Sequence, residues 1–158
     1  MATATECYNA GVEHVKAGRL MDALSLFKKA VDLDPEFRDA HYNLGVTYYA
    51  LGRLDDAKHE YEVVVKLRPN DVDALNNLGT ILALSSKLDL AKELFDRALN
   101  FDPDFALTYR NLAAYYKTIG DEEKMAEYAA KAIELDRKVF EKEPGEPRIG
   151  PDAPLHLF

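Results

Sequence analysis

The chain has 158 residues, of which 47% are hydrophobic and 30% are charged. This balance is typical of a folded soluble protein and excludes a disordered chain. The formal net charge of −8 disfavours binding to nucleic acid or to an anionic membrane surface. A single cysteine excludes a disulfide framework, and no segment approaches the roughly 18 apolar residues of a membrane span. The first residues lack the basic start and apolar run of a secretory signal, so we expect a cytoplasmic protein.

Apolar residues recur at spacings of three and four, which predicts helices that each bury one face. Alternation with period two, as a strand would need, is absent. In chain order the predicted helices cover residues 4–17, 20–33, 38–51, 54–67, 72–85, 88–101, 106–119 and 121–143. The fold class predicted from this pattern is all-α.

The first helix of each predicted pair ends at a residue suited to a left-handed turn. Gly18, Gly52 and Gly120 occupy this position, where glycine adopts positive φ at little steric cost. Ser86 replaces glycine in the third pair, so we expect a looser turn there.

Prolines and a capping box mark other helix ends. Pro35, Pro69 and Pro103 cannot continue the second helix of a pair, because proline lacks an N–H group and clashes with the preceding turn. Thr3 and Glu6 have the spacing of a capping box for the first helix.

The sequence repeats itself along the chain. Asn9, Asn43, Asn77 and Asn111 each follow the previous one by 34 residues, and the proline positions keep the same step. We therefore divide the chain into repeats at 4–37, 38–71, 72–105 and 106–139, within an array spanning 1–143. Residues 144–158 are rich in proline and glycine and form a separate C-terminal tail.

The repeat resembles the tetratricopeptide repeat (TPR) family. In the second and third repeats the family's marker positions are filled by Leu44, Gly45, Tyr48, Gly52, Ala57, Tyr61 and Pro69, and by Leu78, Gly79, Ala91, Phe95, Ala98 and Pro103. The resemblance implies a right-handed superhelical solenoid of antiparallel helix pairs. The fourth repeat departs from the pattern with Met125, Ala129 and Arg137, and without a proline at 137 its last helix can continue to about residue 143.

In this family the first helix of each repeat lines a concave groove, and the asparagine position faces into it. An asparagine amide complements the N–H and C=O groups of a peptide bond. The resemblance therefore implies that Asn9, Asn43, Asn77 and Asn111 form a ladder that holds an extended peptide by its backbone. The alternative is that these amides bond local backbone or an adjacent helix.

Further groove-facing positions follow from the repeat register. They are Tyr8, Val12, Tyr42, Val46, Tyr49, Asn76, Thr80, Ala83, Leu84, Arg110, Ala114 and Lys117. Rigid amphipathic tyrosines suit contacts with peptide side chains, although they could instead pack between repeats. Asp39 and Asp73 would give the groove a negative rim, which favours a ligand that carries some positive charge.

Family members that bind chaperones grip an acidic C-terminal tail with a clamp of lysine, asparagine and arginine. Only Asn43 matches that clamp here. Tyr8 and Val12 occupy its first two positions, and Asp73 and Asn77 replace its last cations. An aspartate would repel a ligand carboxylate, so this sequence disfavours binding of acidic chaperone tails.

Catalysis and metal binding have little support. Cys7, His14 and His41 fall in core-packing positions, so we expect satisfied interior residues rather than zinc ligands. No phosphate loop or nucleophile motif is present, and we expect neither an enzyme nor a bound cofactor or metal.

Three functions remain open from the sequence. The first is an adaptor that binds an extended peptide of a protein partner. The second is a self-associating scaffold in which the apolar end of the tail, Leu155–Phe158, occupies its own or a neighbour's groove. The third is a regulatory subunit of a larger enzyme or chaperone complex.

Overall fold

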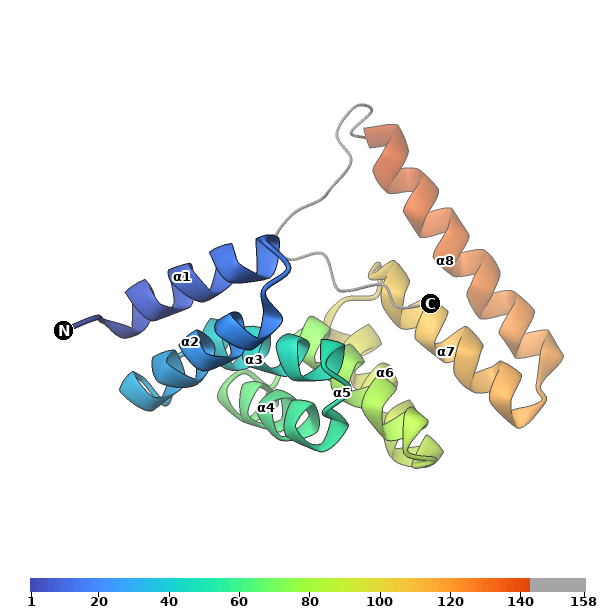
Figure 1. Ribbon diagram of the computed structural model, residues 1–158. Coiled ribbons are helices and arrows are strands. Elements are labelled where there is room, and N and C mark those ends of the chain that lie inside the picture. Colours follow the sequence, from blue (N-terminus) through green and yellow to red (C-terminus); the bar gives the residue numbers. More distant parts are fainter. Residues whose placement is uncertain (143–158) are drawn as a thin grey trace. The chain divides into compact units, whose positions relative to one another are not determined.

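The computed structural model describes residues 1–142 and places eight α-helices in that range (Figure 1). They are α1 (Ala4–Lys16), α2 (Leu20–Leu33), α3 (Arg38–Ala50), α4 (Leu54–Leu67), α5 (Val72–Leu84), α6 (Leu88–Phe101), α7 (Ala106–Ile119) and α8 (Glu122–Lys142). Every predicted helix is present, and each end lies within one residue of the predicted position. The all-α fold class is confirmed for these residues, and the predicted tail, 144–158, lies outside them.

The described residues form two compact units, 1–69 and 70–142. In the first, α1 packs on α2 and α3 packs on α4, while α2 also contacts α3. The second repeats this plan with α5 to α8, and there α5 also touches α7. Figure 1 shows the two helices of each pair side by side. Each unit therefore contains two helix pairs.

The turn inside each pair has one backbone conformation in all four repeats. Gly18, Gly52 and Gly120 have φ of 72°, 73° and 80°, as predicted. Ser86 also adopts the left-handed conformation, with φ of 60°. Its N–H donates to the carbonyl of Ala83 at 3.0 Å, a bond equivalent to the one from Gly52. The expected looser turn at Ser86 is therefore wrong, because the hydrogen bonds of the turn hold serine in the glycine conformation.

The helices of a pair are in contact where a glycine faces an aromatic ring. A β-carbon at Gly79 would lie 2.5 Å from Cε1 of Phe95, and one at Gly45 would lie 2.9 Å from Cε1 of Tyr61. Real β-carbons do not approach so closely, so only glycine fits while the ring stays in place. In the last repeat the equivalent positions are Ala113 and Ala129, so both the glycine and the ring are absent there.

His41 is buried between α3 and α4, as expected. Its Nδ1 lies 2.7 Å from Oε2 of Glu60, and its Nε2 lies 3.0 Å from the carbonyl oxygen of Pro35. The hydrogen bond to Glu60 is the main cause that raises the pKa of His41, although burial acts in the opposite direction. The imidazole therefore ties both helices of the second repeat to the turn that precedes them.

We predict that Gly79→Ala destabilises the protein by about 1–3 kcal/mol, because the added methyl group meets the Phe95 ring. Helix propensity alone predicts the opposite sign, a gain of roughly 1 kcal/mol. Urea denaturation followed by circular dichroism measures the change. Adding Phe95→Leu to the Gly79→Ala variant should lower the cost of the alanine. A more stable Gly79→Ala protein would contradict the close contact.

The His41–Glu60 pair predicts a pH dependence of stability. A raised folded-state pKa means that the contribution of His41 to the free energy of unfolding is fully present below its unfolded pKa, about 6.5. It is lost as the pH rises through the folded-state pKa. We therefore expect the stability difference between the wild type and His41→Gln to shrink with rising pH in urea denaturation. The exposed neighbour His59 is the control, and His59→Gln should leave the pH profile unchanged. A difference that stays constant would refute the role of this pair.

Candidate asparagine site

The asparagines at the repeat positions lie on the first helices, and two of them bond to a neighbouring first helix. Asn43 on α3 is partly exposed. Its Nδ2 donates to the hydroxyl oxygen of Tyr8 on α1 at 3.1 Å and to the carbonyl of Asp39 at 3.0 Å. The amide of Asn43 therefore links α3 to α1, and its orientation is fixed by both bonds.

A second network joins α5 and α7. Nδ2 of Asn111 donates to Oδ1 of Asn76 at 2.9 Å. Nδ2 of Asn76 in turn donates to Oγ1 of Thr108 at 2.8 Å and to the carbonyl of Val72 at 2.9 Å. Asn76 is 0% exposed, so in this arrangement it supports Asn111 rather than reaching a peptide.

The other two asparagines differ from this pair. Asn9 is exposed, and its side chain has no hydrogen-bond partner among residues 1–142. Asn77 is partly exposed on α5. The interpretation that the amides bond an adjacent helix thus describes Asn43 and Asn111, whereas the peptide-binding ladder stays a prediction.

The predicted groove tyrosines are packed to different degrees. The Tyr8 ring lies 5.0 Å from Phe37 and 5.8 Å from Phe27, measured between centroids. Tyr42 is 8% exposed, and the guanidinium of Arg38 lies 4.7 Å above its ring. The side chains of Tyr8 and Tyr42 are therefore both packed within the first unit.

Two partly exposed residues of α3 complete this face of the first unit. They are Val46 and Tyr49, and burial raises the pKa of the Tyr49 hydroxyl. Together with Asn43 they leave a mixed surface of amide, hydroxyl and apolar groups.

The predicted charged and apolar groove positions of the second unit differ in their surroundings. Arg110 on α7 donates two hydrogen bonds to the carboxylate of Asp136 on α8, at 3.0 and 2.9 Å, so its charge is matched within the unit. Lys117 is exposed, and Leu84 at the end of α5 is 51% exposed. Of the two predicted cations, Lys117 alone is left without an ion pair to any residue that the structure describes.

The three residues considered as metal ligands have different surroundings. Cys7 is buried, and His41 is held by Glu60 and Pro35. His14 differs from the expectation of an interior residue, because Nε of Arg19 donates to its Nδ1 at 3.1 Å at the partly exposed end of α1. No group of three or more potential ligands occurs within the described part of the chain.

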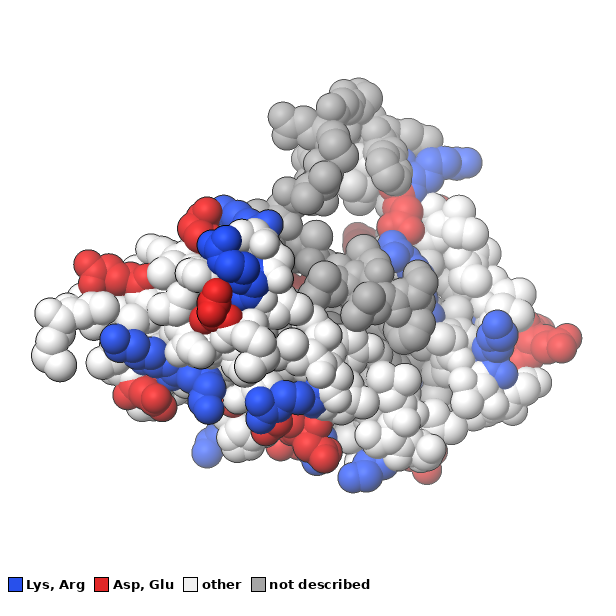
Figure 2. All heavy atoms as spheres, in the orientation of Figure 1, with Lys and Arg blue, Asp and Glu red and all other residues white. Residues whose placement is uncertain are grey.

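Two further features are the signs of the surface charges and the apolar character of the helices. On the face drawn in Figure 2, lysine and arginine side chains alternate with aspartate and glutamate. Across the described helices, none combines the length and apolar character that a membrane crossing requires.

Sequence inspection missed Thr108. It occupies the repeat position held by Ala40 and Ala74, where a small buried residue is expected. Its hydroxyl accepts the bond from Asn76, so threonine and Asn76 form a matched pair in the second unit. Asn76 and Thr108 each differ from the residues at the same position of the other repeats, and these two differences together could have indicated the pair.

We predict that Asn76→Ala lowers the free energy of unfolding by about 1–3 kcal/mol, because Thr108 and Asn111 lose a buried partner. Urea denaturation measures this loss. The matched control is Asn9→Ala, an exposed site where a change of less than about 0.5 kcal/mol is expected. Equal effects at the two sites would argue against the network.

Comparison with known proteins identifies the family to which this fold belongs. A tetratricopeptide repeat model matches residues 14–78, and a second one matches residues 72–105 and 106–139. A comparison with curated proteins finds no match.

Solved structures share the fold. A crystal structure of MamA is 23% identical, with a TM-score of 0.79 over 87% of this chain and 81% of MamA. MamA from Desulfovibrio magneticus RS-1 is 24% identical, with a TM-score of 0.77 over 85% of this chain and 76% of that one. The first TPR of Spaghetti (RPAP3), bound to the HSP90 peptide SRMEEVD, is 21% identical, with a TM-score of 0.71 over 75% and 94%. Family models and fold agree, and this chain belongs to the tetratricopeptide repeat family.

Proposed function

We propose that this chain is a non-catalytic adaptor that binds an extended peptide segment of a protein partner. The TPR fold supports a protein–protein interaction scaffold. We extend this to the first-helix faces, where the first unit presents Asn9 and Asn43 and the second presents Asn77 and Asn111. The same proposal includes action in the cytoplasm and the absence of a catalytic site, cofactor or metal.

The observation that carries the proposal is the orientation of Asn43 and Asn111. Their Nδ2 groups donate to groups within the protein, whereas Oδ1 of each accepts no hydrogen bond from residues 1–142. Both side chains are partly exposed. An amide oxygen held in a fixed position is suited to accept the N–H of a peptide backbone, because little side-chain entropy is then lost on binding.

Neighbouring groups define the ligand further. In the first unit Val46 and Tyr49 offer partly exposed apolar surface for side chains, and in the second unit Leu84 offers apolar surface and Lys117 a charge. The buried Tyr42 supports the face of the first unit, and the buried Asn76 and the paired Arg110 support that of the second.

An acidic ligand of the kind bound by the similar Spaghetti domain is less suitable here. The clamp positions hold Tyr8 and Val12 in the first repeat and Asp73 and Asn77 in the third. Tyr8 packs on Phe27 and Phe37, and its hydroxyl accepts from Asn43. We therefore propose a neutral or basic segment. Occupation of the site by the tail, 144–158, involves residues outside the described range.

The test uses peptides selected on the intact chain from a random displayed library. We expect the combined change Asn43→Ala, Asn77→Ala and Asn111→Ala to weaken their binding about 10- to 2,000-fold, because one hydrogen bond of about 0.5–1.5 kcal/mol is lost at each of the three sites. Isothermal titration calorimetry measures the affinity, and circular dichroism checks that helicity is kept.

Asn100→Ala is the control, since Asn100 is exposed on a second helix, α6. Its affinity should equal that of the wild type. A folded triple variant that binds the selected peptides with unchanged affinity would remove the asparagine ladder from the proposal.

A further inference from the structure

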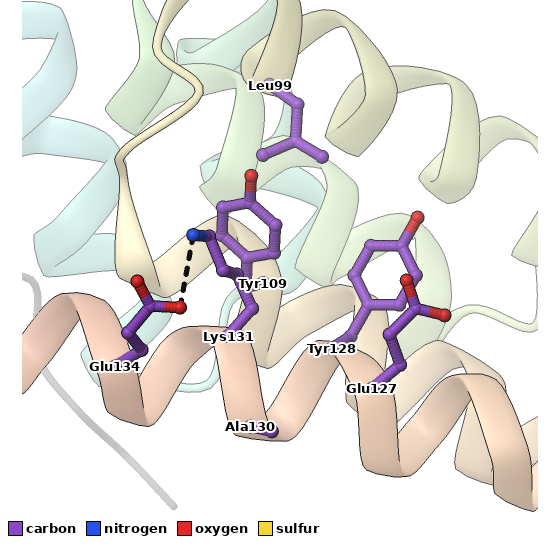
Figure 3. Close-up of a pocket in the computed structure, with 7 residues that line it drawn as sticks. All are labelled: Leu99, Tyr109, Glu127, Tyr128, Ala130, Lys131 and Glu134. Atoms are coloured by element: carbon purple, nitrogen blue, oxygen red, sulfur yellow. Dashed lines mark hydrogen bonds and ion pairs between the residues drawn. The ribbon is translucent and has the colours of Figure 1, made fainter.

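A cleft opens between the second helices α6 and α8, with α7 contributing to its lining (Figure 3). Its volume is about 550 Å³. Figure 3 shows side chains that extend from α8 toward Leu99 of α6. The groups used below are Leu99, Tyr109, Glu127, Tyr128, Lys131 and Glu134, all within the second unit. None of them belongs to the asparagine positions or to the predicted groove residues.

The charges that line this cleft leave one carboxylate unmatched. Nζ of Lys131 lies 3.2 Å from Oε2 of Glu134, and Lys138 donates to the other oxygen of Glu134 at 2.6 Å. Glu127 is exposed and forms no ion pair with any residue in the described range. The cleft can therefore accept a cation at Glu127 without breaking an existing pair.

Two tyrosine rings, Tyr109 and Tyr128, also line this cleft. The centroids of Tyr109 and Tyr128 are 6.0 Å apart, and the Tyr109 hydroxyl donates to the carbonyl of Pro103 at 2.8 Å. Tyr128 also packs against Tyr116, with centroids 5.2 Å apart. Its hydroxyl has no hydrogen-bond partner among residues 1–142. Burial is the main cause that raises the pKa of that hydroxyl; Tyr116, Asp96 and Glu127 add to the rise and Lys92 opposes it, so the phenol stays neutral and able to bond a ligand.

We propose that this cleft binds an arginine side chain of a partner protein. A planar guanidinium can stack on a tyrosine ring while it donates to the Glu127 carboxylate and the Tyr128 hydroxyl. Its aliphatic stem would lie along Leu99. Lysine fits less well, because an ammonium group is not planar and presents no fork of donors to a carboxylate. The proposal adds a second, charge-selective contact on the second unit and does not depend on the asparagine positions.

The probe is the tripeptide amide Ac-Leu-Arg-Leu-NH₂, compared with the same peptide carrying citrulline, which has the shape of arginine without its charge. Both are titrated into the full-length ¹⁵N-labelled chain and followed by ¹H–¹⁵N correlation spectra. We expect saturable shifts at Leu99, Tyr109 and the helix α8 amides around Tyr128. The arginine peptide should bind about tenfold more tightly than the citrulline peptide.

Glu127→Gln should remove most of that preference. Glu123→Gln is the matched control, because it deletes one exposed carboxylate from the same helix and should keep the preference. Equal binding of the two peptides, equal losses in both variants, or shifts confined to the helices that carry Asn43 and Asn111 would each overturn the proposal. Those outcomes leave the asparagine site untouched, so the two proposals fail separately.

Discussion

The contact between a glycine on the first helix of a pair and an aromatic ring on the second sets the distance between the two helices. Phe27, Tyr61 and Phe95 fill this role in successive repeats, and each lies where a β-carbon on the opposite glycine would collide with it. The ring is buried in all three cases. Because this distance is fixed, the face that each first helix turns away from its partner is fixed as well.

That fixed spacing explains how single amides can bridge first helices. Asn43 reaches Tyr8 and Asn111 reaches Asn76 across adjacent repeats of one unit, at distances of 3.1 and 2.9 Å. Bonds of this length tolerate little displacement. Asn43 and Asn111 thus have two roles. Their nitrogen atoms hold neighbouring helices together, and in our proposal their oxygen atoms meet the ligand.

Much of the fold followed from local chemistry that a sequence displays. Glycine at the turn, proline after the second helix and the Thr3–Glu6 capping box each act on adjacent residues, and all are present in the structure. The prediction for Ser86 was wrong because the hydrogen bonds of the surrounding turn outweigh the preference of serine against a left-handed backbone. His14 was misjudged because a position that is buried in later repeats is partly exposed in the first.

The candidate sites were harder to predict, since they depend on partners distant in sequence. A column of asparagines looks the same whether the amides face a ligand or a neighbouring helix. The ion pair of Arg110 could not be predicted, because its partner Asp136 lies 26 positions away in the sequence. The cleft beside Tyr128 combines residues of three helices, which no single segment of the sequence brings together.

In our proposal the asparagine amides contact the bound peptide. The most direct measurement follows the side-chain NH₂ resonances of Asn43, Asn77, Asn111 and Asn76 while a selected peptide is titrated into the labelled chain. We predict shifts that saturate with binding for the first three and smaller shifts for the buried Asn76. Peptide binding that leaves the NH₂ resonances of Asn43, Asn77 and Asn111 unmoved would contradict it.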